Sequence, residues 1–122
     1  MRAPRDAADY LQDMAEYADK ACRLIDGLDY ATFAGDEKTH LAVIRCLEVI
    51  GEAAKKVPAA FRKRHPAVPW AEAAGIRDIL VHDYFGVNLE VVWNTVLRDL
   101  PSLKRALVPL LASNTGPGFP ND

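Results

Sequence analysis

Apolar residues recur every three or four positions along most of this 122-residue chain, the spacing that places them on one face of an α-helix. The first helix is expected over residues 4–26, with Pro4 in its first turn and Gly27 at its exit. Its apolar stripe consists of Leu11, Met14, Ala18, Ala21, Ile25 and Leu28. The next segment, residues 29–35, contains two aromatic residues and is predicted to be a packed connection.

A second helix is predicted from Asp36, a suitable N-cap, to about Val57, where a proline ends it. Its broad apolar face consists of Leu41, Ile44, Leu47, Val49, Ile50, Ala53, Ala54 and Val57. Residues 58–69 contain three prolines, so a short helical turn and a loop are expected there. A third helix is predicted over residues 71–83 or slightly less, and Gly86 can adopt the left-handed conformation that closes it.

A fourth helix is predicted over residues 89–111, with Asn88 as its N-cap and a kink or break at Pro101, which lacks a backbone donor. Its core positions are Val92, Val96, Leu100, Leu103, Leu107, Val108 and Leu111. Since no strand pattern is present, the sequence predicts an all-α fold: an up-and-down bundle of four main helices with short connections. The domain is expected over residues 1–112, followed by a disordered tail over residues 113–122.

Composition adds limits to this picture. The chain has no apolar run long enough to cross a membrane and no signal peptide, so a cytoplasmic protein is expected. The net charge is −2, so any binding of nucleic acid must depend on a local patch of positive charge. Cys22 and Cys46 lie beside apolar residues in helical segments and are expected to be reduced core residues.

Residues whose side chains could take part in catalysis are concentrated in one segment, Arg77-Asp78-Ile79-Leu80-Val81-His82-Asp83-Tyr84. A guanidinium is always charged and matches phosphate oxygens with two parallel hydrogen bonds. A histidine can transfer protons near neutral pH, and a tyrosine hydroxyl can donate, accept or be modified. Arg77, His82 and Tyr84 are therefore candidates for handling a phosphodiester.

The sequence around this motif resembles the HepT-like family of the HEPN superfamily. The resemblance is carried by residues 48–57 (EVIGEAAKKV), 69–78 (PWAEAAGIRD), 81–87 (VHDYFGV) and the following helix, which opens VNLEVVW. It covers nearly the whole chain except the tail, in the order that the family has. The fold it implies is a HEPN-like helical bundle.

The resemblance also implies a function. It implies an endoribonuclease toxin that cuts RNA rather than DNA, acts as a homodimer and uses no metal or other cofactor. It implies as partner a minimal nucleotidyltransferase antitoxin, which transfers adenylyl groups onto the toxin. By this match Arg77 and His82 are catalytic and Tyr84 is the modified residue.

Helix geometry bears on how the motif could work. Residues five apart on an α-helix are about 140° apart around its axis, so Arg77 and His82 would not share a face, whereas Arg77 and Tyr84 nearly would. Two copies of the segment at a two-fold axis could bring both pairs into one cleft. A composite site at a homodimer interface near residues 77–84 is therefore predicted. The fitting reaction is metal-independent transphosphorylation, with Arg77 stabilising charge on phosphoryl oxygens and His82 as base or acid.

These side chains also have structural interpretations. His82 could stabilise the negative end of a helix dipole, and Tyr84 could be a core or interface aromatic. Asp78 could orient Arg77 or His82, or be a solvated charge. Arg77 could simply pair with a nearby carboxylate: Asp78, Asp83 or Glu72.

Outside the motif, the densest positive run consists of Lys55, Lys56, Arg62, Lys63 and Arg64. Such a run is usually a solvated face, but in an RNA-cutting protein it is the leading candidate for a track that binds phosphates. Glu48 and Glu52 lie on one helical face, and the favoured role for Glu52 is an i,i+4 ion pair with Lys56. His40 and His65 lack ligand-like spacing to cysteines or carboxylates, so no metal site is predicted.

Two functions of different classes remain open. The intact pair of Arg77 and His82 favours an endoribonuclease toxin that is neutralised by adenylylation of Tyr84. The near-neutral net charge slightly favours the other, a catalytically idle subunit that supports a partner nucleotidyltransferase and contacts its nucleotide.

Overall fold

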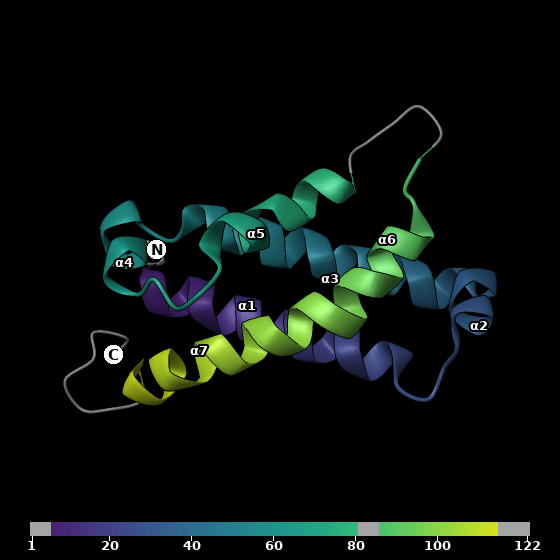
Figure 1. The fold of residues 1–122 in the computed structure, drawn as a ribbon, viewed down its shortest axis with the longest axis horizontal. Helices are drawn as coiled ribbons and strands as arrows, with labels where there is room; N and C mark the ends of the chain where they lie inside the picture. Colours follow the sequence, from purple (N-terminus) through teal and green to yellow (C-terminus); the bar gives the residue numbers. More distant parts are fainter. Residues whose placement is uncertain (1–5, 81–85, 115–122) are drawn as a thin grey trace, which may run out of the picture.

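The structure is a computed structural model that describes residues 6–80 and 86–114. The described ranges contain helices and no strand, which confirms the predicted all-α fold (Figure 1). In chain order the helical elements are α1 (Ala7–Ile25), α2 (Tyr30–Gly35), α3 (Glu37–Lys56), α4 (Ala59–Arg64), α5 (Trp70–Gly75), the 3₁₀ helix η1 (Ile76–Ile79), α6 (Leu89–Asn94), the π-helical segment η2 (Thr95–Asp99) and α7 (Leu100–Asn114).

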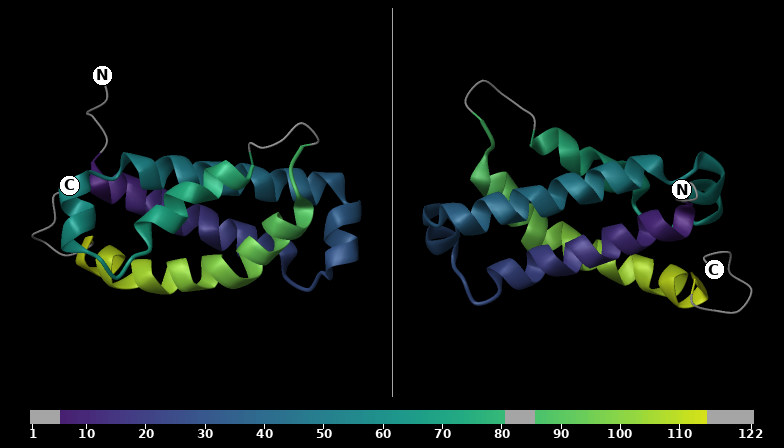
Figure 2. Two further views of the ribbon diagram at one scale, coloured as in Figure 1. Left: turned by 45° about the horizontal axis from the view of Figure 1, so that its top comes forward. Right: turned by 180° about the vertical axis from the view of Figure 1, so that it is seen from behind.

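These elements form four main helical paths. α1 packs along α3 on one side and along α7 on the other, and α5 with η1 lies on α3. α6, η2 and α7 follow one another without interruption and form the fourth path (Figure 2). Successive paths run in opposite directions, so the predicted up-and-down bundle is confirmed.

α1 begins later than Pro4 suggested, because Asp6 is its N-cap. The Asp6 carboxylate accepts a hydrogen bond from the backbone N–H of Asp9 at 3.2 Å, and the Asp9 carboxylate accepts one from the N–H of Asp6. Gly27 follows with φ +80°, the left-handed conformation expected at the exit. The predicted stripe is buried from Leu11 to Ile25.

The connection before α3 is itself a short helix, α2, capped by Asp29. Phe33 is fully buried, and its ring centroid lies 5.1 Å from that of Trp93 at the start of the fourth path. The packed connection is therefore confirmed. Asp36 caps α3 as predicted: its carboxylate accepts hydrogen bonds from both the backbone N–H and the hydroxyl of Thr39.

Two predicted core positions are wrong. Leu41 is exposed because α3 buries the stripe that begins at Val43, and residues two apart on a helix lie on nearly opposite faces. Val108 is exposed because the buried positions of α7 are Leu100, Leu103 and Leu107, and the next residue is turned 100° away.

The two cysteines divide between the core and its edge. Cys46 is buried, whereas Cys22 is half-buried, with its Sγ 4.0 Å from the carbonyl oxygen of Val96. Burial raises the pKa of both thiols. Within the described residues no helix is long and apolar enough to span a membrane.

The fourth helical path is not broken at Pro101, which lies in the first turn of α7; the segment before α7, η2, is π-helical. The N–H of Leu100 donates to the carbonyl of Thr95, five residues back, directly before Pro101. α7 then continues to Asn114. The remainder of the predicted tail, residues 115–122, lies outside the described residues.

The third predicted helix is α-helical only to Gly75 within the described residues. The α-helix ends at Gly75 and continues as the 3₁₀ turn η1, in which the N–H of Leu80 donates to the carbonyl of Arg77 at 3.1 Å. Residues 81–85, which include His82 and Tyr84, lie outside the described residues. Gly86, where the description resumes, has φ +97°, the left-handed conformation predicted for it.

Candidate active site

Arg77 is fixed in place by a close contact between η1 and α3. A Cβ atom built on Gly51 of α3 would lie 2.9 Å from both the Cβ and the backbone nitrogen of Arg77. No side chain fits at that distance, so only glycine at position 51 lets η1 lie this close. The backbone of Arg77 therefore rests directly on α3, although the two residues are far apart in the sequence.

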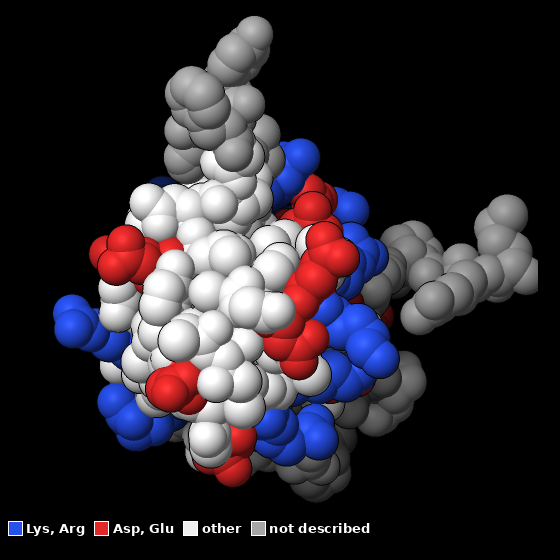
Figure 3. Space-filling view, turned by 90° about the vertical axis from the view of Figure 1, so that its right-hand side faces the viewer, with Lys and Arg blue, Asp and Glu red and all other residues white. Residues whose placement is uncertain are grey.

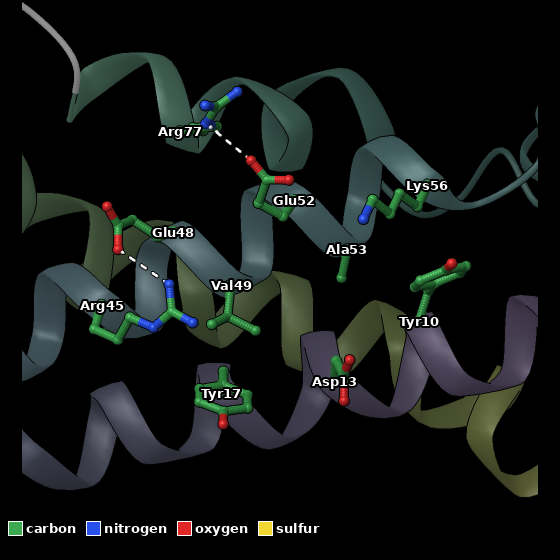
Figure 4. Close-up of a pocket in the computed structure, with 10 residues that line it drawn as sticks. All are labelled: Tyr10, Asp13, Tyr17, Arg45, Glu48, Val49, Glu52, Ala53, Lys56 and Arg77. Atoms are coloured by element: carbon green, nitrogen blue, oxygen red, sulfur yellow. Dashed lines mark hydrogen bonds and ion pairs between the residues drawn. The ribbon is translucent and has the colours of Figure 1, made fainter. Parts of the chain in front are cut away.

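The residue after Gly51 holds the Arg77 side chain. Arg77 Nε lies 3.0 Å from Glu52 Oε2 in an ion pair, and the side chains of Glu52 and Arg77 are 46 % and 45 % exposed (Figure 4). This contact corrects the predicted pair of Glu52 with Lys56. It also differs from two of the partners considered for Arg77, Asp78 and Glu72, whereas the third, Asp83, lies outside the described residues. The prediction was wrong because it considered only partners near in sequence, whereas the contact joins two helices.

The geometry leaves part of the guanidinium available. Glu52 engages Nε, and the terminal nitrogens Nη1 and Nη2 have no partner among the described residues. Two neighbouring N–H groups of this kind match two oxygens of a phosphate. Asp78 is exposed beside Arg77, and its predicted role toward His82 falls on residues outside the description.

Arg77 borders an open groove of about 610 Å³. α1 and α3 form its walls, and Figure 4 shows their side chains facing it below η1. The lining residues are Tyr10, Asp13, Tyr17, Arg45, Glu48, Val49, Glu52, Ala53, Lys56 and Arg77. A second ion pair lies in the groove, with Arg45 Nη1 3.4 Å from Glu48 Oε1. The groove thus combines cations, carboxylates and two tyrosine rings beside Arg77.

The structure separates the five residues of the predicted phosphate track. Lys56 lines the groove beside Arg77. Arg62 and Lys63 line a different hollow, formed with the loop before α5. Arg64 lies against Phe61, with its Cζ 5.6 Å from the ring centroid, in a hollow beside the start of α1. Lys55 is exposed and lines neither hollow nor the groove.

Charge is mixed on the surface as well. Figure 3 shows the end of the bundle at which α2 lies, and there Lys and Arg side chains alternate with Asp and Glu around an uncharged centre. This face therefore offers no broad positive surface to nucleic acid, which agrees with the net charge of −2. In the groove of Arg77 the other cations are Arg45 and Lys56.

The two described histidines have packing partners away from the groove. His40 Nδ1 lies 3.4 Å from the carbonyl oxygen of Phe33, and the His65 ring centroid lies 4.4 Å from that of Phe61. Between residues 6–80 and 86–114, no three or more His, Cys, Asp or Glu side chains gather as a metal site would require. Neither histidine lines the groove of Arg77.

Sequence reasoning missed the roles of Gly51 and Glu52, although one signal was present. A glycine inside an amphipathic helix costs about 1 kcal/mol relative to alanine, so its presence often marks a close approach of another backbone. Gly51 interrupts the apolar face of α3 in this way, and Glu52 follows it directly.

Comparison with known proteins adds independent findings. The family description "Ribonuclease HepT-like" matches residues 14–110 of the chain. A Thermococcus cleftensis protein named "Probable ribonuclease HepT" is 47% identical over 100 residues, which cover 82% of this chain and 91% of that protein. A Caldanaerobacter subterraneus subsp. tengcongensis protein named "Putative RNase" is 38% identical over 111 residues, covering 91% and 96%. No solved structure matches.

Proposed function

This chain belongs to the Ribonuclease HepT-like family, and from that premise we propose that it is a metal-independent endoribonuclease. The proposal includes a toxin role, with a minimal nucleotidyltransferase as the antitoxin. The observation that carries it is the state of Arg77: a half-exposed guanidinium, held at Nε by Glu52 beside an open groove, with Nη1 and Nη2 facing no other described group. Such a cation is suited to binding the phosphate that is cut.

The proposed reaction is a transphosphorylation within RNA. A ribose 2′-oxygen attacks the adjacent phosphorus while the bond from phosphorus to the 5′-oxygen breaks. His82 takes the 2′-hydroxyl proton as base or gives a proton to the leaving 5′-oxygen as acid. Arg77 stabilises the negative charge that grows on the non-bridging oxygens. The products are a 2′,3′-cyclic phosphate, or a 3′-phosphate after hydrolysis, and a 5′-hydroxyl.

The homodimer is part of the same proposal. The sequence-based angle between Arg77 and His82 assumed a continuous α-helix, but Arg77 lies on a 3₁₀ turn, where successive residues are about 120° apart. The support is therefore the open groove itself, which leaves the terminal nitrogens of Arg77 accessible from outside the protomer. A second copy about a two-fold axis could bring its own histidine to that side.

The direct test is cleavage of end-labelled RNA by the purified protein in excess chelator. Wild type should leave cyclic-phosphate and 5′-hydroxyl ends, and His82→Ala should abolish cleavage while its helical circular dichroism is retained. His40→Ala is the matched control and should cleave normally, because His40 lies outside the groove. Loss of activity with chelator, or full activity of His82→Ala, would refute the mechanism. A wild type that only supports a nucleotidyltransferase would establish the idle subunit instead.

Neutralisation is proposed to occur by adenylylation of Tyr84. The added phosphodiester anion would pair with the guanidinium of Arg77, and the adenosine would block access to RNA. Tyr84→Phe should therefore remain an active ribonuclease but escape covalent silencing by the partner and ATP. Intact-mass measurement provides the check, since an adenylyl mass on Tyr84→Phe equal to that on wild type would place the modification elsewhere.

A further inference from the structure

We propose that Glu52 is a positioning residue for Arg77: its carboxylate holds the guanidinium through Nε so that Nη1 and Nη2 meet an RNA phosphate in a fixed orientation. This inference rests on the proposed ribonuclease function and deepens it, because it assigns a role to a residue outside the motif at residues 77–84.

The contact has the geometry that orientation requires. Glu52 Oε2 lies 3.0 Å from Nε, the one guanidinium nitrogen nearest the backbone. A carboxylate at this position stops rotation of the guanidinium and leaves the two terminal nitrogens available. The opposite charges of the two groups favour this arrangement. Figure 4 shows the Glu52 carboxylate directed from α3 toward η1, with the terminal nitrogens of Arg77 on the side away from it.

The backbone on both sides of the contact is fixed. Gly51 places the Arg77 backbone against α3, and Glu52 is the next residue of that helix. An ordinary surface ion pair contributes little because two long side chains must be ordered to form it. Here the main-chain contact already brings the two side chains together, so the ordering precedes RNA binding. Such preorganisation lowers the barrier of a reaction that depends on orientation.

A second cross-helix ion pair provides an internal comparison. Lys104 Nζ lies 3.0 Å from Asp19 Oδ1, joining α7 to α1, and these side chains are 35 % and 48 % exposed. Its length and exposure resemble those of the Glu52–Arg77 pair, but neither of its residues lines the groove. If ion pairs between helices served only to hold the bundle together, removing either carboxylate would have the same consequence.

The charge of Glu52 makes the positioning role testable. A carboxylate beside a bound phosphate repels it, so Glu52 should weaken RNA binding even while it orients Arg77. A glutamine at this position keeps an oxygen that can accept from Nε but removes the negative charge. Positioning therefore predicts that both variants lower KM, whereas kcat falls in Glu52→Ala and is nearly preserved in Glu52→Gln.

The experiment measures kcat and KM for RNA cleavage by wild type, Glu52→Ala, Glu52→Gln and the control Asp19→Ala. We expect kcat to fall about 10- to 100-fold in Glu52→Ala, because a misplaced catalytic group typically costs that much. Glu52→Gln should restore kcat to within about three-fold of wild type, and Asp19→Ala should keep wild-type constants. The positioning role is overturned if Glu52→Ala matches Asp19→Ala, or if glutamine restores nothing.

A double substitution separates positioning from a general effect on the fold. Alanine at position 77 leaves Glu52 no cation to hold. Adding Glu52→Ala to Arg77→Ala should therefore cost no further activity, whereas a structural loss would multiply with the first. If the wild type cuts no RNA, the proposed function fails; if it cuts RNA and the two losses multiply, only the positioning role fails.

Discussion

Two segments of this bundle depart from α-helical geometry, and they differ in their sequence context and in what they contact. η1 narrows to a 3₁₀ turn at residues 76–79, and η2 widens to a π-helical segment at residues 95–99. η2 lies directly before Pro101, whose missing N–H disturbs the helix from within. η1 follows Gly75 at the end of α5, where a 3₁₀ turn is common, and the backbone of Arg77 within it lies against Gly51 of α3.

The comparison shows that a candidate functional site can depend on a contact that the local sequence does not reveal. η2 lies close to Pro101, a residue that marks it in the sequence, and Val96 and Leu100 are buried there. η1 is joined to α3 by the close contact between residues 51 and 77, which no local pattern reveals. That contact places Arg77 beside Glu52 and the groove. The irregular segment that packs on α3 is thus the one that carries Arg77, the described residue of the candidate site.

The largest effect is expected for Gly51→Ala, which tests whether the contact between η1 and α3 positions Arg77. The new Cβ would meet the Arg77 Cβ and backbone nitrogen at 2.9 Å, so η1 must move away from α3. RNA cleavage should fall about 10- to 100-fold, since Arg77 moves with η1. The cost of overpacking, about 1 to 3 kcal/mol in the free energy of unfolding, should be partly offset by the better helix propensity of alanine.

Gly75→Ala is the matched control, because a Cβ there meets nothing within 4 Å. It should leave cleavage unchanged and raise stability slightly in urea titrations. Equal activity of the two alanine variants would show that the contact at Gly51 does not position Arg77.

A second prediction compares two basic residues of the predicted phosphate track. Lys56 lines the groove with Arg77, whereas Lys63 lines the hollow near α5. Lys56→Gln should weaken RNA binding about five-fold and reduce the salt dependence of log K by about 0.7, the effect of one lost contact to a single-stranded phosphate. Lys63→Gln should change neither. Binding isotherms at several salt concentrations measure the affinity and its salt dependence. Equal effects of the two variants would support a phosphate track that includes both residues.

A smaller effect is expected at the other irregular segment. Pro101→Ala supplies the missing N–H but also frees the unfolded chain, so the free energy of unfolding should change by less than about 1 kcal/mol. The buried side chains of Leu100 and Leu103 hold the path of the helix in either case. RNA cleavage should be unaffected. A marked loss of activity in Pro101→Ala would mean that η2 shapes the site as much as η1 does.

The smallest effect concerns the ion pair between α1 and α7. Hydrogen bonds from Lys104 and then Arg23 lower the pKa of Asp19 below its ordinary value of 3.8. A lowered folded-state pKa stabilises the fold above the unfolded value, and this contribution is lost as the pH falls through the folded one. Asp19→Asn should therefore lower Tm slightly at pH 7, and the difference should shrink below pH 3.8. A constant difference across that range would assign the effect to packing.

Much of the fold was accessible from the sequence because its determinants are local. Asp36 and Asn88 cap their helices as predicted, and Gly27 adopts the expected left-handed conformation. The errors arose where an apolar residue was assigned to the core without the neighbouring helix being known. Leu41 and Val108 are the examples: each has the right chemistry for burial but faces away from the packed stripe.

The candidate site was only partly accessible. Arg77 could be singled out because its guanidinium suits a phosphate, and the structure places it at an open groove. Its partner Glu52 could not be identified from the sequence. Helical spacing favours a pair of Glu52 with Lys56, whereas the observed pair depends on how η1 packs on α3. The roles of His82 and Tyr84 remain predictions on residues outside the described ranges.

The most direct test of the central claim, that Arg77 acts on RNA phosphate, is the single-turnover cleavage rate of Arg77→Ala in excess chelator. Arg23→Ala is the matched control, since Arg23 Nε is also held by a carboxylate, Asp19 Oδ2 at 2.8 Å, but away from the groove. We expect Arg77→Ala to cleave about 100- to 1,000-fold more slowly than wild type, the usual cost of losing one electrostatic donor to the transition state. Arg23→Ala should cleave at the wild-type rate. Equal rates for the two variants would contradict the claim.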